Sequence, residues 1–335
     1  MSLFPRKPLQ SLAAALALAA GLATALVSPA AFGQGGQPVK FVVGFPPGGA
    51  TDMIARLLAE RTRPILNQTV VVENKPGIGG RLGVETVKNN PADGLTWMIA
   101  PNATGVFQAL LYPTSVLRFD FLADLTPVAM IVSYPLALAV SPKTGATNAR
   151  AFIDYVKANP AQGLFGTAGL GGHTHFSGLE LAKTAGAALT VVPYKGNGPL
   201  VTDLLGGQVP AAILTAGDII QFHRDGKVKV VGVFGPKRSP LMPDVPTLIE
   251  QGYNVDTGDA WIGMWANSKT SKADIARMEG AVRQVLAQPD VKEQLTTKAV
   301  MTVDFRGAAE LDQIQKKEFA YWAPVIKATG FKPEQ

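Results

Sequence analysis

The first glycine-rich segment of the chain, residues 45–52, could bind an anion. It reads Phe-Pro-Pro-Gly-Gly-Ala-Thr-Asp, follows the apolar residues 39–43 and precedes a helical pattern at 51–65. Backbone N–H groups at a helix start lack partners within the helix, and the helix dipole favours negative charge there. Glycine has no Cβ, so a ligand can approach this backbone closely. The alternative is that Thr51 or Asp52 only caps the helix while the glycines form a tight turn.

A second segment, residues 166–175, repeats this pattern with the sequence Gly-Thr-Ala-Gly-Leu-Gly-Gly-His-Thr-His. Thr174 is a candidate helix cap and ligand donor. His173 and His175 suggest a metal site, but residues two apart at a helix start point to different sides. The one other histidine is His223, so we expect no metal. A histidine in this turn either helps to hold a carboxylate or packs, and the sequence leaves both open.

Other candidate positions also follow predicted strands. Asn102 and Thr104 lie there, and open α/β sheets bind ligands at the carboxyl ends of their strands. Lys195 could pair with an anion or face solvent. The segment 77–83 lacks the third glycine of a dinucleotide fingerprint because Leu82 stands in its place. The sequence also lacks a P-loop and a Gly-x-Ser-x-Gly elbow, so we expect neither a nucleotide cofactor nor an activated serine.

Residues 1–33 have the parts of a cleavable signal peptide. Two basic residues precede an apolar stretch at 9–27, and small residues follow up to Gly33. Cleavage after Gly33 or after Ala30 fits this pattern. A membrane anchor is the alternative, but Ser28-Pro29 interrupts the apolar stretch. The sequence therefore predicts a protein exported to the periplasm.

Composition narrows the classes of protein further. The 335 residues are 47% hydrophobic and 17% charged, which suits two folded domains and not a disordered chain. The absence of cysteine excludes a disulfide scaffold, an iron–sulfur cluster and a cysteine nucleophile. Without residues 1–33 the chain keeps 29 basic and 25 acidic residues, a net charge of +4, with no basic tract. Nucleic acid is therefore not a predicted partner.

Short apolar runs alternate with amphipathic segments, which predicts an α/β fold with largely parallel sheets. Strands are expected at 39–43, 70–72, 96–99, 128–132, 136–140, 189–192, 210–214, 228–234 and 261–266. Helices are expected at 51–65, 80–89, 147–158, 174–185, 198–206, 217–225, 245–251, 271–287 and 307–328. Turn-rich breaks near 141–145 and 256–259 predict a discontinuous domain 1, made of 38–140 plus 259–335, and a domain 2 at 141–258.

A series of motifs runs in order through residues 38–330. They are Phe-Pro-Pro-Gly-Gly-Ala-Thr-Asp at 45–52, Val-Val-Val-Glu-Asn-Lys-Pro-Gly at 70–77, Pro-Ala-Asp-Gly at 91–94, Val-Pro-Tyr-Lys-Gly at 192–196, Thr-Asp-Leu-Leu-Gly-Gly-Gln at 202–208, Gly-Lys-Val-Lys at 226–229 and Lys-Arg-Ser-Pro-Leu-Met-Pro-Asp-Val-Pro-Thr at 237–247. Together they resemble the Bug family, the extracytoplasmic solute receptors of tripartite tricarboxylate transporters. No single motif is specific, but the ordered set is.

The resemblance implies a type II periplasmic-binding-protein fold, in which two α/β domains close by a hinge on a ligand in the cleft between them. It also implies a small organic acid as ligand: a di- or tricarboxylate, an acidic amino acid or an aromatic acid. One carboxylate would meet 45–52 and the far one 172–174, with water bridging to the backbone. The sequence departs from the family's usual pattern in Gly-Gly-His-Thr-His at 171–175 and in Gly-Asp-Ala-Trp at 258–261, so the identity of the ligand does not carry over.

The predicted ligand-binding residues combine the turns at 45–52 and 166–175, a third turn at 192–198 between a strand and a helix, the strand end at 102–104, and positions that the resemblance adds. They are Phe45, Pro47, Gly48, Gly49, Ala50, Thr51, Asp52, Asn102, Thr104, Thr167, Gly172, His173, Thr174, Tyr194, Lys195, Asp218 and Trp261. No catalytic residue, metal or cofactor is predicted. The expected partners are the carboxylate and the membrane subunits of a transporter, and the protein is expected to be a monomer.

Two other functions stay open at this point. One is a secreted enzyme that uses His173 or His175 as a general base. The other is a receptor that signals to a membrane sensor instead of feeding a transporter. The sequence does not separate the second alternative from transport.

Overall fold

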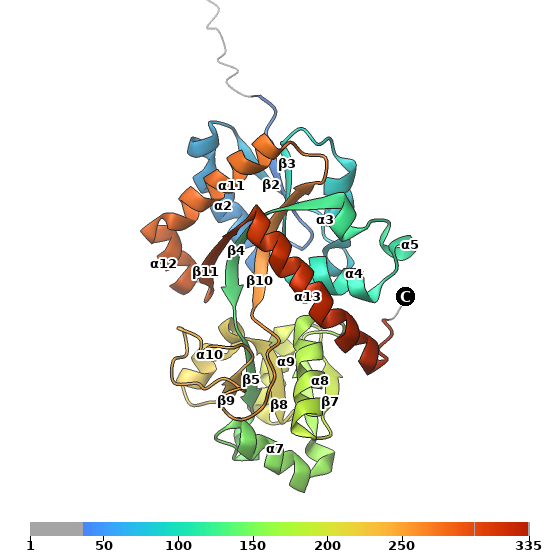
Figure 1. The fold of residues 1–335 in the computed structure, drawn as a ribbon. Helices are drawn as coiled ribbons and strands as arrows, with labels where there is room; N and C mark the ends of the chain where they lie inside the picture. The colour runs from blue at the N-terminus through green and yellow to red at the C-terminus, as the bar shows by residue number, and fades with distance from the viewer. Residues whose placement is uncertain (1–35, 298, 334–335) are drawn as a thin grey trace, which may run out of the picture. The chain divides into compact units, whose positions relative to one another are not determined.

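The computed structural model describes residues 36–297 and 299–333; the predicted signal peptide at 1–33 lies outside them. The elements below all belong to one compact unit, residues 37–335. Two β-sheets organise this unit, and helices pack on both faces of each sheet (Figure 1). The prediction of an α/β fold is confirmed.

The first sheet has the strand order β11-β4-β10-β3-β1-β2. Its strands are β1 (Val39–Val43), β2 (Val70–Asn74), β3 (Thr96–Pro101), β4 (Leu125–Tyr134), β10 (Ala260–Asn267) and β11 (Thr302–Gly307). β1 pairs in parallel with β2 and β3, whereas β10 is antiparallel to β3 and β4, and β11 is antiparallel to β4. We call this sheet and its helices the first lobe.

The second sheet has the order β7-β6-β8-β5-β9. Its strands are β5 (Leu136–Val140), β6 (Leu164–Thr167), β7 (Thr190–Pro193), β8 (Ala211–Thr215) and β9 (Lys229–Val233). β6 is parallel to β7 and β8, and β5 is antiparallel to β8 and β9. We call this sheet and its helices the second lobe.

The expectation of largely parallel sheets is wrong for the strands at the junction of the lobes. β4 continues through Pro135 into β5, and β10 returns the chain beside β4, with Ala260 opposite Tyr134 (Figure 1). A chain that leaves one sheet and later returns to it must run in opposite directions on the two passages. The strands that carry the crossings are therefore antiparallel to their neighbours.

The longer helices also follow the predicted pattern, with ends shifted by a few residues. They are α2 (Ala50–Leu66), α3 (Arg81–Asn89), α7 (Ala149–Ala158), α8 (His173–Ala185), α9 (Asn197–Gly206), α10 (Ala216–Arg224), α11 (Lys272–Ala287) and α13 (Ala308–Thr329). The sequence analysis missed α12 (Pro289–Thr297), the π-helical turn η3 (Ala103–Phe107), and the short helices α4 (Gln108–Leu111), α5 (Thr114–Leu117) and α6 (Phe121–Asp124). Single 3₁₀ turns lie at η2 (Ile78–Gly80), η4 (Pro142–Thr144) and η5 (Pro160–Gln162).

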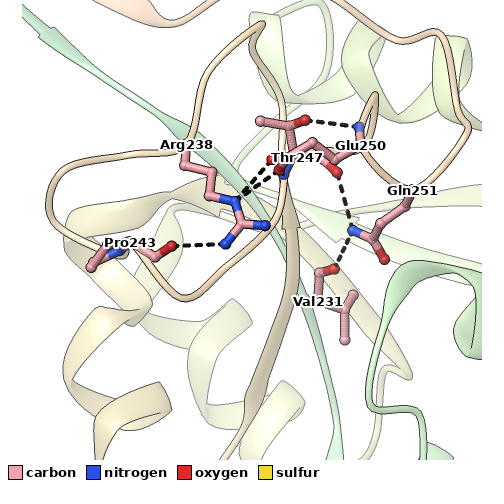
Figure 2. Close-up of polar contacts among 6 residues, drawn as sticks. All are labelled: Val231, Arg238, Pro243, Thr247, Glu250 and Gln251. Carbon is pink, nitrogen blue, oxygen red and sulfur yellow. Dashed lines mark hydrogen bonds and ion pairs between the residues drawn. The ribbon is translucent and has the colours of Figure 1, made fainter.

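The helix predicted at 245–251 is absent, because tertiary contacts hold this segment in turns. Thr247 forms a bridge with Val233 at the end of β9, which requires extended backbone. Figure 2 shows the side chains that fix the segment: the Arg238 Nε atom donates to both Glu250 carboxylate oxygens at 3.0 and 2.9 Å. The Gln251 amide donates to the Val231 carbonyl at 2.8 Å. These contacts fasten the returning connection to the second lobe.

Candidate functional site

A cavity of about 480 Å³ opens between elements of the two lobes. Its lining comes from the turn between β1 and α2, the end of β3, the crossing at Tyr134, the starts of α9 and α10, β10, and residues 299–301. The residues are Phe45, Ala50, Thr51, Met53, Pro101, Tyr134, Asn197, Thr215, Gly217, Asp218, Ile262, Ala299, Val300 and Met301. The parallel neighbours β1 and β3 of the first sheet end here, and so does β8 of the second sheet, as expected for a ligand site in an α/β sheet.

The start of α2 forms one wall of the cavity. Gly49 is the N-cap, with extended backbone and no side-chain capping bond. The first helical hydrogen bond runs from the Met53 N–H to the Gly49 carbonyl at 2.9 Å. The N–H groups of Ala50, Thr51 and Asp52 precede it, and Ala50 and Thr51 line the cavity. This wall therefore offers backbone donors and the positive end of a helix dipole.

The turn before α2 is braced by a side-chain network. The Asp52 carboxylate accepts from the Gly48 N–H at 2.9 Å, from Arg56 Nε at 2.8 Å and from Asn74 Nδ2 at 2.8 Å. Asn74 also donates to the Phe45 carbonyl at 3.1 Å. Burial alone raises the pKa of Asp52, but the hydrogen bonds from Arg56, Gly48 and Asn74 bring it below its usual value. Asp52 thus holds the turn in shape, with its carboxylate engaged by three donors.

The opposite wall is built by the starts of α9 and α10. Asn197 is the first residue of α9, and Thr215 is the N-cap of α10. Asp218, in the first turn of α10, accepts from Asn197 Nδ2 at 2.6 Å and from the Thr215 hydroxyl. Tyr134 lies beside this group, and burial followed by the Asp218 charge raises the pKa of its phenol. Three helix starts therefore converge on one cavity.

The second glycine-rich turn has a different environment. His173 is 5% exposed and His175 is 2% exposed. His173 donates through Nε2 to the Thr257 carbonyl at 2.8 Å, since a carbonyl oxygen only accepts. His175 Nδ1 accepts from the Gly171 N–H at 3.1 Å. Burial lowers the pKa of each histidine to about 4, so both are neutral at physiological pH.

These two histidines belong to an aromatic cluster that joins the lobes. Phe107 of η3 and Trp322 of α13, in the first lobe, each place a ring centroid 5.3 Å from that of His173 in α8. Phe331 meets His175 at 5.1 Å and Phe176 at 5.8 Å. The sequence left open whether a histidine here holds ligand or packs; both pack in this structure.

Asn102 and Trp261 are buried beside a carboxylate that the sequence analysis did not single out, that of Glu318. The Trp261 indole N–H donates to Glu318 Oε1 at 2.6 Å, and Asn102 Nδ2 lies 3.4 Å from Glu318 Oε2. Burial raises the pKa of Glu318 to about 7, despite these two donors. Thr104 is fully buried, and its hydroxyl has no partner among the described residues.

The structure brings some of the predicted site residues together and separates others. Phe45, Ala50, Thr51 and Asp218 line the cavity, and Pro47, Gly48, Gly49 and Asp52 belong to the same turn. Outside the lining are Asn102, Thr104, Thr167, Gly172, His173, Thr174, Tyr194, Lys195 and Trp261. Gly172 and Thr174 are half-buried, and Lys195 is exposed.

Sequence reasoning missed Tyr134, Asn197, Thr215 and Gly217 as cavity residues. A usable signal existed for two of them, because Asn197 ends a Gly-rich turn and Thr215 ends an apolar strand. The described residues contain no cluster of three or more potential metal ligands, and none of their helices is long and apolar enough to cross a membrane.

Two α/β lobes with a cavity between them define the class of two-lobed solute-binding proteins, and solved structures agree. The protein Rpa4515 of R. palustris, solved with adipate, is 27% identical with a TM-score of 0.77, over 89% of this chain and 99% of that chain. MatC from Rhodopseudomonas palustris, solved with bound malate, is 30% identical with a TM-score of 0.72, over 86% and 98%.

The family follows from the sequence comparisons. The model of the tripartite tricarboxylate transporter family receptor, TctC, matches residues 54–331. The protein BugT of Bordetella pertussis is 33% identical over 300 residues, which cover 88% of this chain and 90% of the relative. The chain therefore belongs to the TctC family of receptors, and the resemblance noted in the sequence is confirmed.

Proposed function

We propose that this receptor captures a small organic carboxylate in the cavity at the start of α2 and delivers it to the membrane subunits of a tripartite transporter. The observation that carries the proposal is the pair of lining residues Ala50 and Thr51, whose N–H groups precede the first helical hydrogen bond. Two similar proteins were solved with malate and with adipate, which are both carboxylates.

The energetics of such a site are adequate without a basic side chain. A helix start contributes about 0.3–1 kcal/mol to the binding of an anion, and up to about 2 kcal/mol when partly buried. Each hydrogen bond to a charged oxygen adds about 1.5–3 kcal/mol. Micromolar binding needs about 8 kcal/mol. A few backbone hydrogen bonds, apolar contacts with Phe45 and Ile262, and closure of the lobes can supply this.

Receptor function is favoured over catalysis by the state of the histidines. A general base must reach its substrate, whereas His173 and His175 are buried among aromatic rings. We propose that the chain is not an enzyme. We further propose, from the sequence of residues 1–33, that it is exported by a cleaved signal peptide. A monomeric state and the domain boundaries at 140/141 and 258/259 stay predictions.

Calorimetry tests the proposal. Purified protein lacking residues 1–33 is titrated with mono-, di- and tricarboxylates, including malate and adipate, and with the corresponding uncharged amides. We expect saturable heat with at least one carboxylate and none with its amide. Binding of the amides alone, or turnover of an ester in place of binding, would contradict it.

A further inference from the structure

We propose that the ligand is asymmetric: a carboxylate at the start of α2 and, at its other end, a hydrogen-bond donor such as an ammonium or hydroxyl group that faces Asp218. This inference rests on the proposed function and names the substrate class of the same site. It distinguishes this receptor from one built for two carboxylates.

The wall that contains Asp218 presents acceptors to the cavity. Asn197 and Thr215 both point a donor at Asp218, through the Asn197 amide N–H and the Thr215 hydroxyl. What these side chains have left for a ligand is the Asn197 amide oxygen and its second N–H, the lone pairs of the Thr215 hydroxyl and the second Asp218 oxygen. Acceptors outnumber donors among these groups, which favours a ligand group that donates.

The charge of this wall also favours a ligand group that donates hydrogen bonds. Asp218 is exposed, lines the cavity, and is the one formally charged side chain among the described lining residues. No ion pair within the described residues includes it. A second ligand carboxylate brought against this wall would meet a like charge, which disfavours it. An ammonium there would be attracted, and a hydroxyl would find a charged acceptor.

The two walls thus have opposite polarity. At α2 the positive end of the helix dipole faces the cavity without a carboxylate beside it there, because the Asp52 carboxylate is hydrogen-bonded to Gly48, Arg56 and Asn74. At α10 the helix start is offset by Asp218, which is held in the cavity lining by Asn197 and Thr215. A ligand with one anionic end and one donor end fits this gradient in a single orientation.

The test compares ligands that differ only at the far end, by calorimetry. The probes are five-carbon acids: pentanoate, glutarate, 5-aminopentanoate and 5-hydroxypentanoate, with the four- and six-carbon sets as well. We expect the wild-type protein to bind the amino or hydroxy acid at least about tenfold more tightly than the dicarboxylate of the same length, a difference of about 1.4 kcal/mol. In Asp218→Asn this preference should shrink at least about tenfold.

The matched control is Asp225→Asn, the same exchange at the C-cap of α10, where Asp225 contacts Gln221 and Lys227. It should leave the preference unchanged. Thermal unfolding of each variant establishes that it is folded. Tighter binding of the dicarboxylates by the wild type, or an unchanged preference in folded Asp218→Asn, overturns the inference alone. If no carboxylate binds, pentanoate included, the proposed function fails and the inference fails with it.

Discussion

Two glycine-rich turns of similar sequence lie in different environments in this molecule. The turn at 45–52 enters α2 with its helix-start N–H groups at the cavity and its one carboxylate tied back by Arg56 and Asn74. The turn at 166–175 enters α8 with both histidines buried against the other lobe. A strand, glycines and a helix start are common to both.

The residues just inside each helix account for the difference. After Gly49 come Ala50 and Thr51, which are too small to cover the backbone donors. After Gly172 come His173 and His175, whose rings reach Phe107, Trp322 and Phe331. A glycine-rich helix start is therefore permissive for anion binding, and the following side chains decide whether the site stays open or becomes a packing contact.

The largest expected effect is a loss of stability when the aromatic cluster packed against the second turn is truncated. Phe107→Ala should lower the free energy of unfolding by about 3–5 kcal/mol, since it leaves a cavity among His173, Phe176 and Trp322. Chemical denaturation measures the loss. The control is Leu122→Ala at a 47% exposed side chain, which should change stability by less than about 0.5 kcal/mol. A loss below about 1 kcal/mol for Phe107→Ala would contradict the role given to the cluster.

Removing one backbone N–H donor from the start of α2 should weaken ligand binding and leave stability largely unchanged. Ala50→Pro removes the N–H at the first position of α2, where proline suits a helix and Gly49 is already extended. We expect affinity for the carboxylate to fall by about ten- to hundredfold, the value of a charge-assisted hydrogen bond, with little change in thermal stability.

Lys272→Pro is the matched control for this change, because Lys272 is the first residue of α11 and follows the extended N-cap Ser271. It introduces proline at the same position of a helix that starts outside the cavity lining, and affinity should stay as in the wild type. Equal affinities for Ala50→Pro and Lys272→Pro would remove the start of α2 from the site.

Acidification should weaken the second turn. His173 and His175 have folded pKa values of about 4, below the unfolded value of 6.5, so the unfolded chain binds more protons in this range. Their contribution to stability is complete above pH 6.5 and is lost as the pH falls to about 4. The expected loss is about 3 kcal/mol for each histidine, measured by denaturation at several pH values.

The double variant His173→Gln with His175→Gln isolates this effect, because its stability should depend less on pH between 4 and 6.5. The difference from the wild type cancels the opposite contribution of Glu318. The folded pKa of that group is raised from 4.5 to about 7, so its stabilisation is lost as the pH rises. Parallel pH profiles for the wild type and the double variant would show that the histidines are not buried neutral groups.

The smallest effect concerns the brace of the first turn. Asn74→Ala removes the donor shared by the Phe45 carbonyl and Asp52 and leaves both acceptors with fewer partners. We expect a loosened turn and an affinity about three- to tenfold lower, which corresponds to about 1 kcal/mol of binding free energy. Gln68→Ala is the control, an amide on the same lobe that contacts Arg277. An unchanged affinity in Asn74→Ala would show that the turn keeps its shape without the brace.

The sequence predicted the parts of this fold that local pattern controls. The strand 136–140 and the helix 51–65 were close to their observed bounds, since apolar periodicity and flanking turns specify them. β6 and β11 were missed because Gly163 and Gly166 weaken one pattern and Asp304 and Arg306 interrupt the other. The predicted helix at 245–251 failed because pairing of Thr247 with Val233 overrides local preference.

The site was predictable only in part. The first turn could be found from its glycines and the helix after it; Phe45, Ala50 and Thr51 line the cavity, and that they bind the ligand stays a prediction. The packing of His173 could not be predicted from the sequence, because its partners Phe107 and Trp322 lie far from it along the chain. The Asn197–Asp218 contact likewise joins two helices whose proximity only the fold reveals.

The most direct test of the account is a crystal structure of the protein with a bound carboxylate that calorimetry has identified. We predict carboxylate oxygens within hydrogen-bonding distance of the backbone N–H groups of Ala50 and Thr51, with the other end of the ligand at Asp218. A ligand whose carboxylate instead contacts residues 172–174, with the start of α2 facing solvent, would contradict it.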